Sequence, residues 1–285
     1  MKINFTKMHG CGNDYVYIDG GKELVPQEKK SELAIKVSDR HFGIGSDGLI
    51  FINPVDDPSV DFEMEMYNAD GSRSEMCGNG IRCVGKYIYD YGLSDKTEIT
   101  VESAGAVKYL TLYPGEDGKI EKVRVNMGSP ILKSELVPVV SDNETVIDEA
   151  ITVNGKEYKM TCVSMGNPHA VVFMDDVKGL DIEALGPYFE NHERFPKRTN
   201  TEFVKVIDRS HVFMRVWERG TGETLACGTG CCATAVACVL NGLTDETVDV
   251  NVLGGHIQIE WDRQNDIIYM TGPAKVSFDG EYKEN

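Results

Sequence analysis

Two of the eight cysteines, Cys77 and Cys227, occur in the same local pattern, Cys-Gly-x-Gly followed by an apolar run. The pattern predicts that each cysteine lies at the N-terminus of a helix. Backbone N–H groups there have no intrahelical partner and the helix dipole is positive, which favours a bound carboxylate and a thiol pKa below the usual value of about 8.5. Two thiols facing one carbon beside a carboxylate could remove a proton from one side and return it on the other. We therefore predict inversion of configuration at such a carbon.

An internal repeat relates the two cysteines. Residues 62–80 align with residues 212–230 at a constant offset, which pairs Cys77 with Cys227, and Asn13 pairs with Asn167 at a similar offset. In both copies a strand and a polar loop precede the cysteine. A single cysteine before a helix is more often a packing residue, but two copies at equivalent points favour a catalytic role. The repeat predicts two pseudo-equivalent domains.

Short strand-like runs between glycine-rich turns dominate the rest of the sequence. We expect strands within residues 101–112, 122–126, 170–173, 203–207 and 256–261, and helices within residues 28–39, 80–91 and 230–240. Many strands with few helices predict an α+β fold, that is, a mixed α/β protein.

Side-chain periodicity predicts which faces of these elements are buried. In the strand that begins at residue 62, apolar residues should face the core, and Glu63 and Glu65 should lie on the other side. The helix after Cys227 is apolar on every side and should be enclosed, whereas Arg82, Lys86 and Asp90 form one polar stripe on the helix after Cys77.

The composition excludes several classes of partner. The formal net charge of −17 repels phosphate backbones, so we expect no nucleic-acid partner. No apolar run is long enough to cross a membrane and the first residues do not resemble a signal peptide, so we expect a cytoplasmic protein without a membrane partner. Since no Cys-x-x-Cys pair occurs, we expect free thiols and no metal.

The motifs around these residues resemble those of the diaminopimelate epimerase family over nearly the whole chain. They are HGCGNDYV, RHFGIGSDG, YNADGSRSEMCGNGIR, GNPHAVV, RTNTEFV and WERGTGETLACGTG, in the order that the family has them. The resemblance implies two pseudo-symmetric domains, each a strand-rich, barrel-like sheet around a central helix, with the active site in the cleft between them. It also implies that the last strand returns to the first domain. We thus expect one domain over residues 1–126 with 273–285, and the other over residues 127–272.

The resemblance implies a role for each matching residue. Cys77 and Cys227 would exchange roles as acid and base with the support of His169, and Glu218 would contact the reacting ammonium group. The substrate-binding residues would be Asn13, Asn68, Gly78, Asn79, Asn167, Asn200, Glu218, Arg219, Gly228 and Thr229. The substrate would be 2,6-diaminopimelate, interconverted between its LL and meso forms in lysine and peptidoglycan biosynthesis without a cofactor. We also expect a homodimer.

One departure from the family and two alternative functions stay open. Gly48 stands where many members carry a glutamine that reaches the substrate, so that contact is lost. A related epimerase or racemase of proline, hydroxyproline or histidine is the nearest alternative, although Asn79 and Arg219 favour diaminopimelate. A thiol-based redox or metal-binding protein would explain the cysteines but not the two glycine loops. The phenazine-biosynthesis isomerases share the fold but do not use two cysteines.

Overall fold

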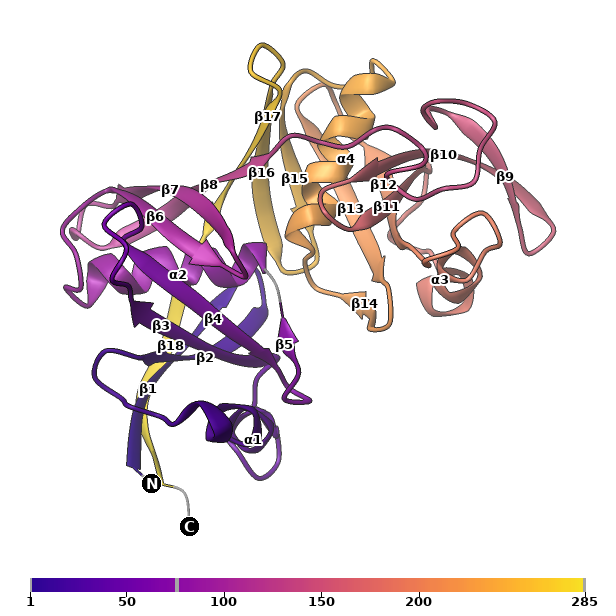
Figure 1. Ribbon diagram of the computed structural model, residues 1–285. Helices are drawn as coiled ribbons and strands as arrows, with labels where there is room; N and C mark the ends of the chain where they lie inside the picture. Colours follow the sequence, from indigo (N-terminus) through magenta and orange to yellow (C-terminus); the bar gives the residue numbers. More distant parts are fainter. Residues whose placement is uncertain (1, 75–76, 284–285) are drawn as a thin grey trace. The chain divides into compact units, whose positions relative to one another are not determined.

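The computed structural model describes residues 2–74 and 77–283 of the 285-residue chain (Figure 1). The chain forms two compact units, residues 1–125 with 272–285 and residues 126–271. Both boundaries fall inside strands, β8 (Ile120–Gly128) and β17 (Ile267–Pro273), each of which begins in one unit and ends in the other. The boundaries expected from the sequence, after residues 126 and 272, lie one residue further along the chain.

The first unit is a sheet with one central helix. The central helix is α2 (Gly78–Asp90). Besides parts of β8 and β17, the unit also contains β1 (Lys2–Gly10), β2 (Asn13–Asp19), α1 (Gln27–Ser38), β3 (Gly48–Pro54), β4 (Phe62–Asn68), β5 (Arg73–Ser74), β6 (Glu98–Ser103), β7 (Ala106–Pro114) and β18 (Lys275–Lys283). β1 pairs antiparallel with β2 and β18, β2 runs parallel to β3, and β4 pairs antiparallel with β3 and β5 and parallel with β6. α2 packs against β1 and β2, which precede it in the sequence, and against β7, which follows it.

The second unit repeats this order and these strand directions. Its elements are β9 (Glu149–Val153), β10 (Lys156–Ser164), β11 (Pro168–Phe173), α3 (Ile182–Glu190), β12 (Asn200–Val206), β13 (His211–Glu218), β14 (Gly222–Thr224), α4 (Gly228–Leu240), β15 (Thr247–Val252) and β16 (Gly255–Asp262). β10 pairs antiparallel with β11, β11 runs parallel to β12, and β13 pairs antiparallel with β12 and β14 and parallel with β15. The predicted mixed α/β fold of two pseudo-symmetric domains is confirmed.

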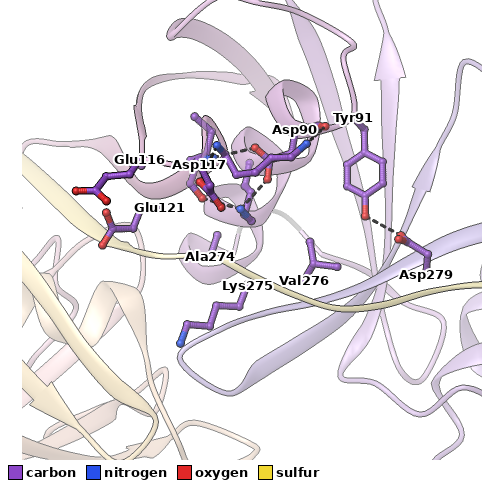
Figure 2. Close-up of a pocket in the computed structure, with 13 residues that line it drawn as sticks. Asp90, Tyr91, Glu116, Asp117, Glu121, Ala274, Lys275, Val276 and Asp279 are labelled. Carbon is purple, nitrogen blue, oxygen red and sulfur yellow. Dashed lines mark hydrogen bonds and ion pairs between the residues drawn. The ribbon is translucent and has the colours of Figure 1, made fainter.

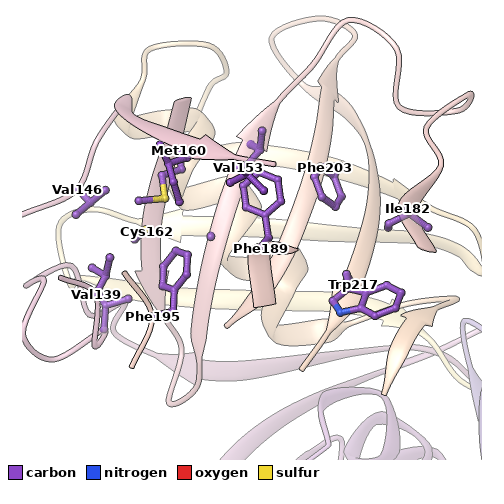
Figure 3. Packing of buried hydrophobic residues seen from close by; sticks show 14 of the residues in the cluster. Val139, Val146, Val153, Met160, Cys162, Ile182, Phe189, Phe195, Phe203 and Trp217 are labelled. Atoms are coloured by element: carbon purple, nitrogen blue, oxygen red, sulfur yellow. The ribbon is translucent and has the colours of Figure 1, made fainter. Parts of the chain in front are cut away.

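The core of the second unit holds the end of β13 in place. α4 is enclosed by β10 to β13, β15 and β16, as its uniformly apolar sequence predicts. A separate cluster of buried hydrophobic side chains includes Phe189 of α3, Phe203 and Trp217 (Figure 3). In this cluster Phe189 packs edge-on against Phe203. The Trp217 indole N–H donates to Glu190 at 2.7 Å. Among the described helices, none is both long enough and apolar enough to cross a membrane.

Several element boundaries differ from the prediction. α2 and α4 each begin two residues earlier than expected, because the glycine that follows each cysteine already belongs to the helix. Residues 101–112 are not one strand: Ala104 and Gly105 have φ of 50° and 80° and form the turn between β6 and β7. α3 was not predicted. It contains Pro187 and begins after Asp181, whose side chain accepts from the Ala184 N–H.

The polar stripe predicted on α2 is buried rather than exposed. Arg82 is fully buried and donates to the Gly78 carbonyl at 3.1 Å, the Asn79 Oδ1 at 2.9 Å and the Pro273 carbonyl at 3.3 Å. Lys86 donates to the Ile120 carbonyl at 2.6 Å. Because hydrogen bonds satisfy these cations, α2 is enclosed in the same way as α4 despite its charges.

Glu65 was predicted to lie on the side of β4 away from the core, but it is only 3% exposed. Its carboxylate accepts from Lys30 at 2.5 Å, Tyr67 at 2.6 Å and Gln27 at 3.0 Å. Burial alone would raise the pKa of Glu65, but these hydrogen bonds, together with one from Asn53, outweigh it and lower the pKa to about 2.

The first unit should therefore lose stability in acid through Glu65. Its folded pKa lies below the ordinary value of 4.5, so the unfolded chain takes up the proton first and stability falls as the pH drops from 4.5 towards 2. The full difference corresponds to about 3 kcal/mol, of which about 2 kcal/mol is lost by pH 3. Urea unfolding at pH 6 and pH 3 should show this extra loss in the native protein and not in Glu65→Gln. Equal losses in the two proteins would contradict the assignment.

Candidate functional site

Cys77 and Cys227 are the N-cap residues of α2 and α4, as the sequence predicts. Their backbones have nearly the same extended conformation, with φ −127° and ψ 115° at Cys77 and φ −116° and ψ 113° at Cys227. Each Sγ accepts a hydrogen bond from the backbone N–H three residues later, from Gly80 at 3.3 Å and from Gly230 at 3.4 Å. The thiol thus takes the place of the serine or threonine oxygen that usually caps a helix.

Cys77 lies beside two residues of β2. Its Sγ is 3.1 Å from Oδ1 of Asn13, and the Asn13 Nδ2 donates to Asp47 at 2.7 Å, which fixes the direction of the amide. The buried Tyr15 hydroxyl forms hydrogen bonds with Cys77 and Asn13. Burial raises the pKa of Tyr15 well above its usual value, and the negative charge that Cys77 can carry adds to the effect, so Tyr15 stays a neutral hydroxyl.

The other predicted residues of the first unit surround the start of α2 and the end of β4. Asn68 is half-buried at the last position of β4, and its Nδ2 donates to the Ser72 hydroxyl at 3.0 Å. Asn79 is 3% exposed, with its Oδ1 accepting from Arg82. Gly78 and Asn79 are the first residues of α2, where backbone N–H groups lack intrahelical acceptors.

Gly48 lies on β3, opposite Asn68 and beside Tyr15. A Cβ at this position would lie 2.2 Å from the Tyr67 carbonyl oxygen and 3.0 Å from the Tyr15 ring. This backbone cannot accept the glutamine that many family members carry, because the Tyr67 carbonyl cannot move aside without moving β4. Tyr15, the neighbour of Gly48 on β2, forms a hydrogen bond with Cys77.

Cys227 is more deeply buried than Cys77, with 6% of its surface exposed. Burial raises the pKa of the Cys227 thiol well above its usual value, and the Glu218 and Glu202 carboxylates raise it further. Hydrogen bonds from Thr229 and the Gly230 N–H lower the pKa, but less. The expectation that the helix N-terminus lowers the pKa was therefore wrong for Cys227, because burial and two nearby carboxylates outweigh the helix end.

Glu218 is the last residue of β13, and Arg219 follows it directly. Glu218 accepts from the Thr224 hydroxyl at 2.5 Å, and burial raises its pKa. The Arg219 N–H donates to Oδ1 of Asn200 at 2.9 Å, and Nδ2 of Asn200 donates to the Pro168 carbonyl at 2.8 Å. Both ends of the buried Asn200 amide therefore bind backbone groups, and Asn200 links β11 to the loop that carries Arg219.

A chain of polar side chains leads from β12 to the Cys227 thiol. His169 is fully buried, with Nδ1 2.7 Å from Oε1 of Glu202 and Nε2 3.1 Å from Oδ1 of Asn167. Asn167 Nδ2 lies 3.3 Å from the Thr229 hydroxyl, which lies 3.5 Å from the Cys227 Sγ. Asn167 and Thr229 therefore connect the His169 ring to the Cys227 thiol within this unit.

The predicted residues fall into two groups, one in each unit. The first unit contains Cys77, Asn13, Asn68, Gly78 and Asn79; the second contains Cys227, Asn167, His169, Asn200, Glu218, Arg219, Gly228 and Thr229. Sequence reasoning missed Tyr15, Asp47 and Glu202. Tyr15 and Glu202 each lie two residues after a predicted asparagine on a strand, and this spacing places them on the same face.

A cavity of about 880 Å³ in the first unit lies away from these residues (Figure 2). Asp90 and Tyr91 line it at the C-terminal end of α2, whereas Cys77 caps the other end of that helix. None of the predicted site residues lines this cavity. Among the described residues, no group of three or more His, Cys, Asp or Glu side chains is placed to hold a metal ion.

Comparison with known proteins gives matches over almost the entire chain. The model of a family described as Diaminopimelate epimerase matches residues 5–133 and 161–277. A protein of Agathobacter rectalis named diaminopimelate epimerase is 57% identical, covering 98% of this chain and 99% of its own. Proteins of the same name from Acetivibrio thermocellus and Methanococcus maripaludis strain C5 are 55% and 53% identical, covering 99% and 98% of this chain and 99% of their own.

Solved structures with low sequence identity share the fold. A phenazine biosynthesis protein of the PhzF family from Bacillus anthracis has a TM-score of 0.72 at 16% identity, with both chains covered completely. A hydroxyproline epimerase from Agrobacterium vitis has a TM-score of 0.68 at 14% identity, covering 98% of this chain and 92% of its own. Because members of one fold carry out different reactions, these two matches bear on the fold alone.

Proposed function

Because this chain belongs to the diaminopimelate epimerase family, we propose that it interconverts LL-2,6-diaminopimelate and meso-2,6-diaminopimelate without a cofactor. The reaction would serve lysine and peptidoglycan biosynthesis. The observation that carries the proposal is the equivalent position of Cys77 and Cys227, each capping the central helix of its own unit. A single thiol would return a proton to the face of the α-carbon from which it had removed one, so the configuration would be retained. Two thiols on opposite faces of the α-carbon invert its configuration.

In the proposed mechanism the two cysteines exchange roles with the direction of reaction. Burial and two carboxylates raise the pKa of Cys227, so this thiol keeps its proton until it delivers it to the α-carbon. Cys77 removes the proton in that direction, and the roles reverse on the way back. The developing charge spreads onto the substrate carboxylate, which we assign to the N–H groups at the starts of α2 and α4, namely those of Gly78, Asn79, Gly228 and Thr229.

We assign the remaining polar residues to the two ends of the substrate. Glu218, next to Cys227, would accept the ammonium group on the reacting carbon, and its negative form becomes more favourable once that cation is bound. Arg219 is half-buried, and its planar guanidinium is suited to a bidentate contact with the distal carboxylate. The amides of Asn13, Asn68, Asn167 and Asn200 would complete the substrate-binding set.

The substrate assignment is tested by isotope exchange. Incubation with LL-diaminopimelate in deuterated water, without pyridoxal phosphate, should give the meso isomer with deuterium at the inverted α-carbon, because the returning proton comes from a thiol that exchanges with solvent. Mass spectrometry and chiral chromatography measure both quantities. Proline, hydroxyproline and histidine serve as comparison substrates. Exchange with one of them and none with diaminopimelate would contradict the assignment.

The two-thiol mechanism is tested by removing each thiol separately. Cys77→Ala and Cys227→Ala should each lower the epimerisation rate by about a thousandfold or more, because no other group can take the missing thiol's place on its face. Cys238→Ala is the matched control, since Cys238 is buried within α4 away from its N-terminus. Full turnover by either site variant, with thermal unfolding showing an intact fold, would rule out this mechanism.

We further propose that the protein acts as a homodimer in the cytoplasm, where reductants keep the two thiols available. Exposed apolar side chains on β18 support a contact between copies of the chain: Phe278 is 49% exposed and Val276 is 37% exposed. Sedimentation at micromolar concentration should give a dimer that Phe278→Asp weakens. Tyr188→Asp, which changes a comparably exposed aromatic residue of α3, should leave it unchanged. A native monomer would contradict the proposal.

A further inference from the structure

Glu202 is a buried carboxylate with only part of its hydrogen-bonding capacity used. It is 0% exposed on β12, and its Oε1 lies 2.7 Å from Nδ1 of His169. It also lies against the first turn of α4, because a Cβ built on Gly230 would be 2.7 Å from the same oxygen. Within the described part of the chain, Oε2 has no hydrogen-bond partner. A charged carboxylate in this position needs a positive partner, and His169 is the residue placed to supply it.

The two contacts of His169 can be made by a ring that carries a proton on each nitrogen. Nδ1 faces the Glu202 carboxylate and Nε2 faces Oδ1 of Asn167, so both ring nitrogens lie against acceptors. Asn167 then presents Nδ2 to the Thr229 oxygen as a donor. The Thr229 hydroxyl hydrogen is left for the Cys227 Sγ, which it stabilises as a thiolate.

The hydrogen bonds that join His169, Asn167, Thr229 and Cys227 can also run in the opposite direction when His169 is neutral. Nε2 would then be an acceptor, and the Asn167 amide would turn to place Nδ2 against it and Oδ1 against Thr229. The Thr229 hydroxyl would donate to Asn167, and its oxygen would accept the S–H of Cys227. One direction of the chain therefore stabilises the Cys227 thiolate and the other stabilises the thiol.

We propose that Glu202 is a positioning residue that holds His169 as the imidazolium and thereby sets the chain in the direction in which Thr229 donates to Cys227. The proposal deepens the function proposed above and rests on it, since it explains how Cys227 can serve as a base in one direction of the reaction. Glu202 touches neither the substrate nor the reacting thiol in this scheme. It acts through His169, Asn167 and Thr229.

Other charged and titratable groups around Glu202 also act on the thiol. They are His169 on β11, Glu218 at the end of β13, Cys162 on β10 and Cys227 before α4. The Glu202 charge, acting directly, raises the pKa of Cys227, whereas the hydrogen bond from Thr229 lowers it. The direct effect of Glu202 and its effect through the chain thus have opposite signs, so an experiment can separate them.

The test is the rate at which iodoacetamide alkylates Cys227 in the full-length protein at a fixed, mildly alkaline pH, followed for this cysteine by mass spectrometry. In Glu202→Gln the rate should fall about tenfold, because a hydrogen bond to a charged group changes a pKa by about one unit. Thr229→Val should give a similar fall, and the double variant should show no further fall, because both changes act on one chain. A faster rate in Glu202→Gln would mean that only the direct charge matters, and an unchanged rate would mean a purely structural role; either result overturns the proposal.

A matched control and a second measurement keep the test decisive. Glu149→Gln removes a carboxylate of the same unit that pairs with Arg194, and it should leave the alkylation rate of Cys227 unchanged. Nitrogen NMR of His169 should show both ring nitrogens protonated in the native protein near neutral pH. A neutral ring there would overturn the proposal even if Glu202→Gln does not fold. Neither measurement needs turnover of diaminopimelate, so their outcome is separate from that of the proposed function.

Discussion

The hydrogen bond from a helical N–H to a cysteine Sγ, made once in each unit, is the constraint on which the rest of the site depends. It holds each thiol against the first turn of a helix that packs against several strands of its own unit. Neighbouring side chains lie close to the first turn of each helix: a Cβ on Gly80 would lie 2.9 Å from the Ile50 side chain, and one on Gly230 would lie 2.7 Å from Glu202. Packing of α2 and α4 thus sets the positions of both sulfurs.

The two units share a topology but give their thiols different electrostatic surroundings. Cys77 is half-buried beside an amide and a neutral tyrosine hydroxyl, whereas Cys227 is buried with two carboxylates nearby. An asymmetric environment suits a reaction that needs one proton donor and one acceptor at any moment.

Local sequence was enough to predict the repeat, the two cysteine-capped helices and the general fold. It failed where burial depends on residues distant in sequence. Arg82, Lys86 and Glu65 have the spacing of surface positions, yet each is buried because a partner from another segment satisfies its charge. The raised pKa of Cys227 was missed for the same reason: its largest cause is burial, to which strands distant in sequence contribute, and Glu202, whose charge adds to the effect, comes from β12. Tyr15 follows Asn13 by two residues on β2, so strand periodicity alone could have predicted that it lies on the same face as Asn13.

The return of the chain's end to the first unit has a consequence for the order of folding. β18 pairs with β1 from Lys2 opposite Lys283 onward, and the Pro273 carbonyl accepts a hydrogen bond from the buried Arg82. During synthesis from the N-terminus, β1 is therefore made long before its partner strand β18, and Arg82 long before the Pro273 carbonyl that accepts its hydrogen bond. The second unit is continuous in sequence and has all of its strands before the first unit receives its last one. The half of the protein that is translated first is thus the half that is completed last.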